Sequence, residues 1–342
     1  MITDLMDKFT HIFGQGLSNG FYPVPQQAIG VGSAFEGWSP RAEGLVYRVL
    51  VPLSPPPGHA FHLELDTAGM PQRNFCVRVE LLCTCTREQL GENMLCFLHH
   101  PEEELRRNQD PSLLHTLCTG SYLDVEKTVH QFHRFVRVAW LHLPQSRHWQ
   151  LMLQPSSRSC KFLLTKGKEG IMVEMLFGVR QGDTDIFVSS QPTDVHFTPS
   201  TTWLETYAVA EAKFFRHIAR QAPCDSCHCK CLQLLSRMLM GVGFSTYTLK
   251  TVVMHLLSTV PPSRWCGRDF AQRLMDILKY LHRCLETKQL NHFVIGNEKF
   301  PTEISLPADI RVVEPPNLFQ YLARDPDAHS RAMHEYAGLL HQ

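Results

Sequence analysis

The spacing of the apolar residues changes once along the chain, near Pro199. Before this point, short runs of alternating apolar and polar residues predict strands, which lie at 45–53, 60–65, 76–83, 151–153, 161–165 and 171–179. After it, apolar residues recur at helical spacing through 202–218, 232–240, 247–257 and 270–285. The chain is therefore expected to be α+β, with an α/β domain at 1–198 and an α-helical domain at 199–342.

Two helices are also expected within the first domain. One lies at the N-terminus, and the other covers 125–140, where Gly120 and Ser121 are expected to form a capping turn. In the second domain, Thr202 and Glu205 have the spacing of a capping box. This pattern predicts that the first helix of the second domain begins there.

The composition is that of a folded protein without a strong charge. The chain has 342 residues, of which 44% are hydrophobic and 19% are charged. Lys+Arg and Asp+Glu both number 33, so no overall field attracts nucleic acid, and no nucleic-acid partner is expected. The sequence has neither a long apolar run nor a signal-peptide pattern, so this chain is expected to be soluble.

The twelve cysteines allow either a disulfide framework or reduced thiols. They include the pair Cys83 and Cys85 and a cluster at 224–231. Reduced thiols are favoured, because a chain of this size can bury a core without disulfides. The cluster also allows a zinc site, with the ligands His217, Cys224, Cys227 and Cys229. These thiols are too close together for two separated knuckles, so a loop of partly buried cysteines is favoured and no metal is expected.

Residues 29–53 combine the features that a nucleotide-transfer site requires. A small-residue turn, Gly32-Ser33, precedes the β-prone run 45–53, and Glu36 and Glu43 lie between them. Backbone N–H groups of such a turn can hold a phosphate, and carboxylates entering a strand can hold a metal ion. The Gly-Ser dipeptide is common in turns, so taken alone it is a weak signal.

Several longer motifs resemble a known family. The helical half, with CLQLL at 231–235 and LETKQLNHF at 285–293, resembles the Mab-type nucleotidyltransferase-fold proteins, whose best known enzyme is cyclic GMP-AMP synthase. GSAFEGWSP at 32–40 and TWLETYAVAEAKFFRHIARQAP at 202–223 are similar to the inositol trisphosphate receptor-interacting protein-like branch, as is the long run 96–128. The resemblance implies a nucleotidyltransferase core, in which helices flank a mixed sheet, followed by a helical bundle.

The resemblance also implies where a catalytic site would lie. In active members a Gly-Ser turn holds the triphosphate, and three acidic residues hold two magnesium ions. Carried over to this chain, the turn is Gly32-Ser33, the acidic pair falls on Glu43 and Leu45, and the third acid is Glu174. Because Leu45 cannot bind a metal, the site is expected to be degenerate, without catalytic activity or a cofactor.

Two alternatives to a lost activity stay open. Glu64 and Asp66 have the i, i+2 spacing that places both carboxylates on one face of a strand, although a solvated edge is the favoured interpretation. An active nucleotidyltransferase would need Glu43, Glu174 and a third carboxylate, from Glu36 or Asp66, to hold magnesium. A third possibility is a cleft that binds a nucleotide or an inositol phosphate without chemistry.

The favoured function is therefore a catalytically inactive protein-interaction module. The resemblance implies a membrane-associated modulator of inositol trisphosphate receptor and calcium signalling, with that receptor or another membrane protein as partner. Members of this branch are usually anchored by an N-terminal single span. This sequence contains no such span, so the anchor is expected to precede it and the chain to be a fragment or a trimmed form.

Overall fold

The computed structural model describes residues 2–16, 20–40, 45–66, 73–191, 198–239 and 245–339. By compactness the chain divides into two units, the first made of Met1–Val31 and Val46–Val209, the second of Gly32–Leu45 and Ala210–Gln342. The domain boundary between residues 198 and 199 stays a prediction. The short segment Gly32–Leu45 belongs to the second unit although first-unit segments flank it on both sides.

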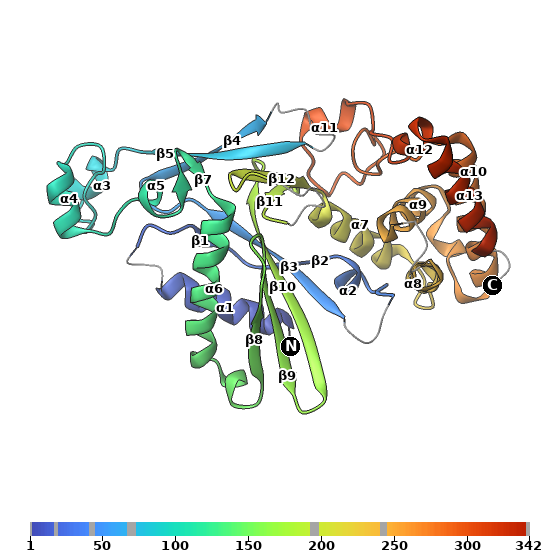
Figure 1. Cartoon of the computed structure of the whole chain (residues 1–342), viewed down its shortest axis with the longest axis horizontal. Helices are drawn as coiled ribbons and strands as arrows, with labels where there is room; N and C mark the ends of the chain where they lie inside the picture. The colour runs from blue at the N-terminus through green and yellow to red at the C-terminus, as the bar shows by residue number, and fades with distance from the viewer. Residues whose placement is uncertain are drawn as a thin grey trace. The chain divides into compact units, whose positions relative to one another are not determined.

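The first unit is built on a mixed sheet, as the α+β prediction requires (Figure 1). Its main path runs in the order β1 (Val24–Pro25), β3 (Val46–Ser54), β10 (Glu169–Arg180), β11 (Phe187–Ser189), β12 (Thr202–Thr206), β5 (Asn74–Leu81), β7 (Tyr122–Leu123) and β6 (Cys118–Thr119). The remaining strands are β2 (Ile29–Val31) on β3, β4 (His59–Asp66) on β5, and the pair β8 (Gln150–Gln154) and β9 (Cys160–Lys166) on β10. Among the described pairings, β3 and β10 are parallel and the others are antiparallel. Each of the six strands expected before Pro199 is present within a few residues of its predicted bounds.

Two local predictions in this region are wrong. Residues Thr202–Thr206 form strand β12, and the helix α7 (Ala208–Gln221) begins only after it. The capping-box spacing was overridden because Trp203 is fully buried in the sheet, where its Nε1 donates to the Leu123 carbonyl at 2.9 Å. Gly120 belongs to the turn between β6 and β7, with φ of +62°, and does not cap a helix.

Helices α1 (Ile2–Gly16) and α6 (Val125–His142) cover the part of the sheet formed by β9 and β10. Asp124 is the N-cap of α6, and its carboxylate accepts the Lys127 backbone N–H at 3.0 Å. The buried rings between these layers stack or meet edge to face, and they are Phe9, Phe13, Phe132, Phe162 and Phe177. This aromatic layer is one part of the core of the first unit, and a second part consists of Val31, Leu50, Leu176, Phe187 and Val209.

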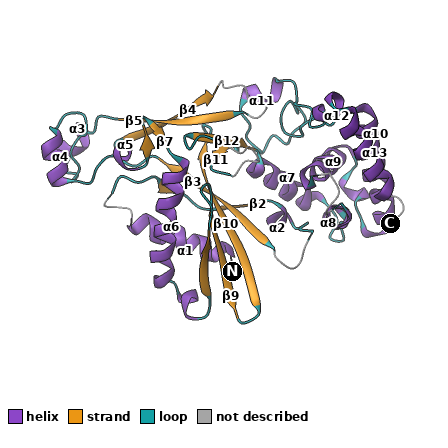
Figure 2. Ribbon diagram, in the orientation of Figure 1, coloured by secondary structure: helices purple, strands orange, loops and turns teal. Residues whose placement is uncertain are grey.

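The second unit is helical, with its elements joined by loops (Figure 2). It contains α2 (Ser33–Glu36), most of α7, α8 (His228–Met238), α9 (Thr246–Thr259), α10 (Phe270–Thr287), α11 (Ala308–Val312), α12 (Gln320–Arg324) and α13 (Pro326–Leu339). Helix α9 is its centre, because consecutive residues from Thr248 to Met254 are all buried. One of these buried residues is a charged side chain, Lys250.

Candidate functional site

Gly32 and Ser33 lie where strand β2 ends and the short helix α2 begins. Gly32 follows β2 with φ of +76°, a conformation that favours glycine, and its carbonyl accepts the N–H groups of Phe35 and Glu36. Ser33 opens the four-residue helix α2. Glu43 lies outside the described residues, and Leu45 is half-buried at the entry to β3, where it offers no carboxylate. Gly32, Ser33 and Leu45 belong to the second unit.

Glu174, the expected third acid, belongs to the first unit and is engaged by basic side chains. It lies on β10 directly opposite Arg48 of the parallel strand β3. Arg48 Nε donates to Glu174 Oε2 at 2.9 Å, and Ser159 Oγ donates to Glu174 Oε1 at 3.0 Å. The Lys161 ammonium lies 3.2 Å from the same Oε1. Both carboxylate oxygens therefore already have partners.

The charge around Glu174 is the opposite of what a magnesium ligand requires. Burial would raise the pKa of this carboxyl group, but Arg48 and Lys161, with the Ser159 hydroxyl, outweigh burial and hold the pKa below its ordinary value. Two nearby cations neutralise the carboxylate and would repel a divalent ion. The described surroundings of Glu174 thus do not fit a two-magnesium centre.

The alternative pair on β4 is occupied in a similar way. Glu64 accepts Arg78 Nε at 2.6 Å and the Tyr122 hydroxyl at 3.0 Å. Asp66 lies opposite Asn74 at the end of the pairing between β4 and β5. The strands β5, β12 and β11 separate β4 from β10. Four interstrand steps of about 4.8 Å place the pair about 19 Å from β10, so it cannot share a metal with Glu174.

Glu36, the other carboxylate considered for magnesium, is part of a buried ion-pair network within the second unit. Lys250 Nζ lies 2.7 Å from Glu36 Oε1 and 2.6 Å from Glu211 Oε2. Trp38 Nε1 donates to the second Glu36 oxygen at 2.6 Å. The pKa of Glu36 is raised, because burial and the nearby Glu211 outweigh the effect of Lys250. The pKa of Glu211 is lowered, because the effect of Lys250 outweighs burial. This carboxylate fastens α2 to α9, a structural role.

The network continues to a buried histidine. The Tyr247 hydroxyl donates to Glu211 Oε1 at 2.9 Å and lies 3.0 Å from His292 Nε2. His292 Nδ1 accepts the backbone N–H groups of Val294 and Ile295, both at 3.2 Å, which assigns the ring proton to Nε2. Burial lowers the pKa of His292 to about 4, so the ring is neutral at physiological pH.

The zinc alternative at His217 and the 224–231 cysteines receives no geometric support. His217 Nδ1 lies 2.8 Å from a Glu303 oxygen, and its Nε2 lies 2.8 Å from Gln221 Nε2. Cys224 is exposed and Cys227 is buried, while the Cys229 thiol donates to the Glu36 carbonyl at 3.4 Å. Within the described ranges, these four residues do not form a group whose ligand atoms converge.

Sequence reasoning did not identify the basic partners of these carboxylates. Arg48 lies 126 positions from Glu174, and only the parallel register of β3 and β10 brings them together. Lys250 carried a usable signal, because it is a lysine inside an otherwise apolar helical face of α9. A buried lysine requires a carboxylate partner, so its presence predicts one elsewhere in the chain.

Comparison with known proteins gives the class of the chain. Residues 227–299 match the Mab-21 protein HhH/H2TH-like domain, which lies within the helical unit. The chain is 36% identical over 332 residues to the rat inositol 1,4,5-trisphosphate receptor-interacting protein-like 1, covering 94% of this chain and 61% of the relative. The identity to the human inositol 1,4,5-trisphosphate receptor-interacting protein is 30% over 318 residues, covering 85% of this chain and 57% of the relative. The chain belongs to the inositol trisphosphate receptor-interacting protein-like family with a Mab-21 C-terminal domain.

The relatives are longer than this chain, which spans about three fifths of their length. Among the described helices, none combines the length and apolar character that a membrane span needs.

Proposed function

We propose that this chain is a catalytically inactive member of the nucleotidyltransferase fold that acts as a protein-interaction module. The observation that supports this most directly is the placement of Arg48 and Lys161 around Glu174. A metal-dependent transferase needs negative charge at this position, because its ions must bind before they can activate a hydroxyl or stabilise a leaving pyrophosphate. In this chain, Arg48 and Lys161 already neutralise the Glu174 carboxylate.

The other candidate carboxylates support the same proposal. Glu36 is buried against Lys250, and Glu64 is held by Arg78 about four strands from β10. Each already has a structural partner, so binding magnesium at either carboxylate would disrupt an existing ion pair. Leu45 contributes no ligand at the position where the resemblance implies the second acid.

The proposed partner comes from the relatives. Their names describe proteins that interact with the inositol 1,4,5-trisphosphate receptor. We extend this interaction to the present chain, as a modulator of that receptor at the membrane in which the receptor lies.

Catalysis is tested by incubating the purified chain with ATP, GTP and Mg²⁺ or Mn²⁺, with and without double-stranded nucleic acid, while measuring pyrophosphate. Cyclic GMP-AMP synthase run in parallel shows that the assay works. The variant Glu174→Gln removes the third acid, and Glu64→Gln is its matched control, a carboxylate on the same sheet with an arginine partner. We expect no pyrophosphate above background from the native chain or from either variant. Product that requires Glu174 but not Glu64 would overturn the proposal.

The interaction is tested separately, by titrating fluorescently labelled chain into purified inositol trisphosphate receptor in nanodiscs and measuring anisotropy. Saturable binding that unlabelled chain reverses is the expected result, and empty nanodiscs are the control. Binding to empty nanodiscs alone would replace the receptor with the lipid surface as partner. No binding at all would remove the receptor from the proposal while leaving the assay of catalysis unaffected.

A further inference from the structure

The segment between β5 and α5 (Leu113–Thr116) forms a lobe with almost no buried residues. It contains the short helices α3 (Cys85–Gln89) and α4 (Glu102–Asn108), neither of which buries a side chain. Between residues 82 and 111, only Thr84 and Cys96 are buried. The lobe extends from the end of β5 (Figure 1), and no apolar core of its own accounts for its fold.

The lobe holds a cluster of three cysteines and one histidine, in which Cys96 is buried, Cys85 is half-buried and Cys83 and His99 are exposed. The ligand atoms of Cys83, Cys85, Cys96 and His99 all lie within 4.8 Å of one another. The His99 Nδ1 atom lies 3.5 Å from Cys83 Sγ, 3.1 Å from Cys85 Sγ and 3.3 Å from Cys96 Sγ. Three thiols from two chain segments thus face one ring nitrogen.

We infer that Cys83, Cys85, Cys96 and His99 form a structural zinc site. A tetrahedral ion with Zn–S bonds of about 2.3 Å and a Zn–N bond of about 2.0 Å holds its sulfur and nitrogen ligands about 3.5 Å apart. The three sulfur–nitrogen distances lie close to this value. Three thiolates and an imidazole select zinc over magnesium or calcium, which prefer oxygen ligands.

The ligands come in two sequence pairs, as in structural zinc sites, and the first pair is one residue closer than the usual minimum spacing. One residue lies between Cys83 and Cys85, two residues lie between Cys96 and His99, and ten residues lie between the two pairs. The two pairs form separate knuckles, which is the feature that the 224–231 cluster lacks. Four protein ligands fill the tetrahedron, so the site is closed and supplies folding energy instead of catalysis.

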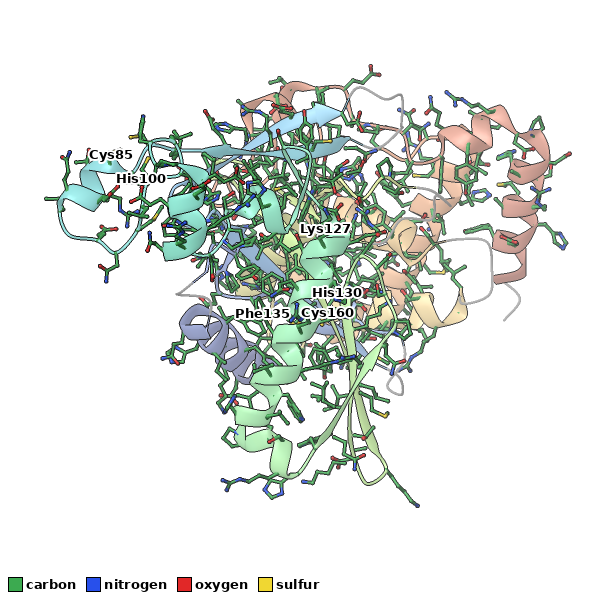
Figure 3. All side chains as sticks on the ribbon, turned by 60° about the vertical axis from the view of Figure 1, so that its left-hand side comes forward. Cys85, His100, Lys127, His130, Phe135 and Cys160 are labelled. Carbon is green, nitrogen blue, oxygen red and sulfur yellow. The ribbon has the colours of Figure 1, made fainter. Side chains whose placement is uncertain are left out.

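Contacts around the cluster orient its ligands. The Thr84 backbone N–H donates to Cys96 Sγ at 3.4 Å, and the Cys96 backbone N–H donates to a Glu88 oxygen at 3.3 Å. The same Glu88 carboxylate lies 2.9 Å from His100 Nε2. Figure 3 labels Cys85 and His100, which both belong to this lobe. Such second contacts hold metal ligands in position.

The first experiment measures metal on the complete chain, purified without chelator from zinc-supplemented cells. We expect about one zinc ion per chain by inductively coupled plasma mass spectrometry. After exchange into cobalt, the visible d–d bands of a tetrahedral site and a thiolate-to-cobalt charge-transfer band are expected. Absence of zinc together with failure to take up cobalt under reducing conditions would overturn the inference.

Variants identify the ligands. Cys85→Ser is expected to lose the zinc, whereas Cys224→Ser, which changes an exposed cysteine outside the cluster, is expected to keep it. Because loss of a ligand can unfold the lobe, His99→Cys is the second test. It should retain zinc, and after exchange into cobalt it should show a stronger thiolate-to-cobalt charge-transfer band from a fourth thiolate. Zinc retained in full by Cys85→Ser, or a disulfide among Cys83, Cys85 and Cys96 in non-reducing mass spectrometry, would contradict the proposed site.

Discussion

Replacing Lys250 with methionine is expected to destabilise the helical unit, because it removes the cation between two buried carboxylates. The Lys250 side chain is 6% exposed, and those of Glu36 and Glu211 are 1% and 5% exposed. Methionine has a similar volume, so the change removes charge with little change in packing. Removing one partner of a buried ion pair costs about 3–5 kcal/mol, since the remaining charge is buried without compensation.

The loss should also depend on pH, which a simple packing defect would not. Without Lys250, burial raises the pKa of Glu211 above its value in the unfolded chain, the reverse of its lowered pKa in the native protein. A carboxyl group with a raised folded pKa destabilises the protein as pH rises above the unfolded pKa, by about 1.4 kcal/mol per unit until the folded pKa is reached. The difference between Lys250→Met and the native chain is therefore largest near neutral pH and shrinks toward pH 4.

The assay is urea unfolding at several pH values, combined with amide hydrogen exchange of α9 to locate the loss. Lys8→Met is the matched control, because Lys8 forms a 2.9 Å ion pair with Asp4 on an exposed face. That variant is expected to lose less than about 1 kcal/mol. A Lys250→Met variant that loses no more than the control, or whose deficit is the same at pH 5 and pH 7, would refute the reasoning.

Three further predictions concern buried or constrained groups. The low pKa of His292, about 4, predicts that the free energy of unfolding falls by about 1.4 kcal/mol per unit as pH falls from about 6.5 toward 4, and an NMR titration midpoint near 6.5 would contradict it. Asp124→Ala removes the N-cap of α6 and the acceptor of the Thr119 and Ser200 hydroxyl groups, so the free energy of unfolding measured in urea should fall by about 2 kcal/mol. Asp124→Asn should recover part of the loss. Gly296→Ala places a Cβ 2.5 Å from the Val313 carbonyl at a residue whose φ is +71°, so the melting temperature of this variant should fall clearly. Gly338→Ala is its control, because Gly338 lies on α13 with no atom near the added Cβ, and this variant should be neutral or slightly stabilised.

The fold class was predictable because it depends on local periodicity. Helix α10 buries Ile277, Leu281 and Leu285, as the spacing indicated, and the strands of the first unit follow their alternating runs. The helix predicted at Thr202 failed, because pairing with β11 and β5 decided the structure there. Such pairing depends on segments far away in the chain, which no local pattern reports.

For the candidate site, the sequence alone shows which side chains can act as metal ligands. Leu45 excludes a ligand whatever its surroundings, so this part of the prediction needed no structure. The occupation of Glu174 by Arg48 depends on strand register and could not be read from the sequence. In contrast, the spacing of Cys83, Cys85, Cys96 and His99 was visible from the start. Their significance came from the lobe around them, in which Thr84 and Cys96 are the buried residues among those described and no apolar core is present.

The discontinuous second unit has a consequence for synthesis of the chain. Glu36 leaves the ribosome long before Lys250, its partner 214 positions later. The segment Gly32–Leu45 contains Glu36 and Trp38, which are both buried in the complete protein. Until α9 has been made, the second unit that buries them is incomplete. The helical unit can therefore complete its core only after translation has passed α9, so it depends on contacts of high sequence separation. A truncated chain that starts at Ala210 would never acquire Glu36 and would fold around an incomplete ion-pair network.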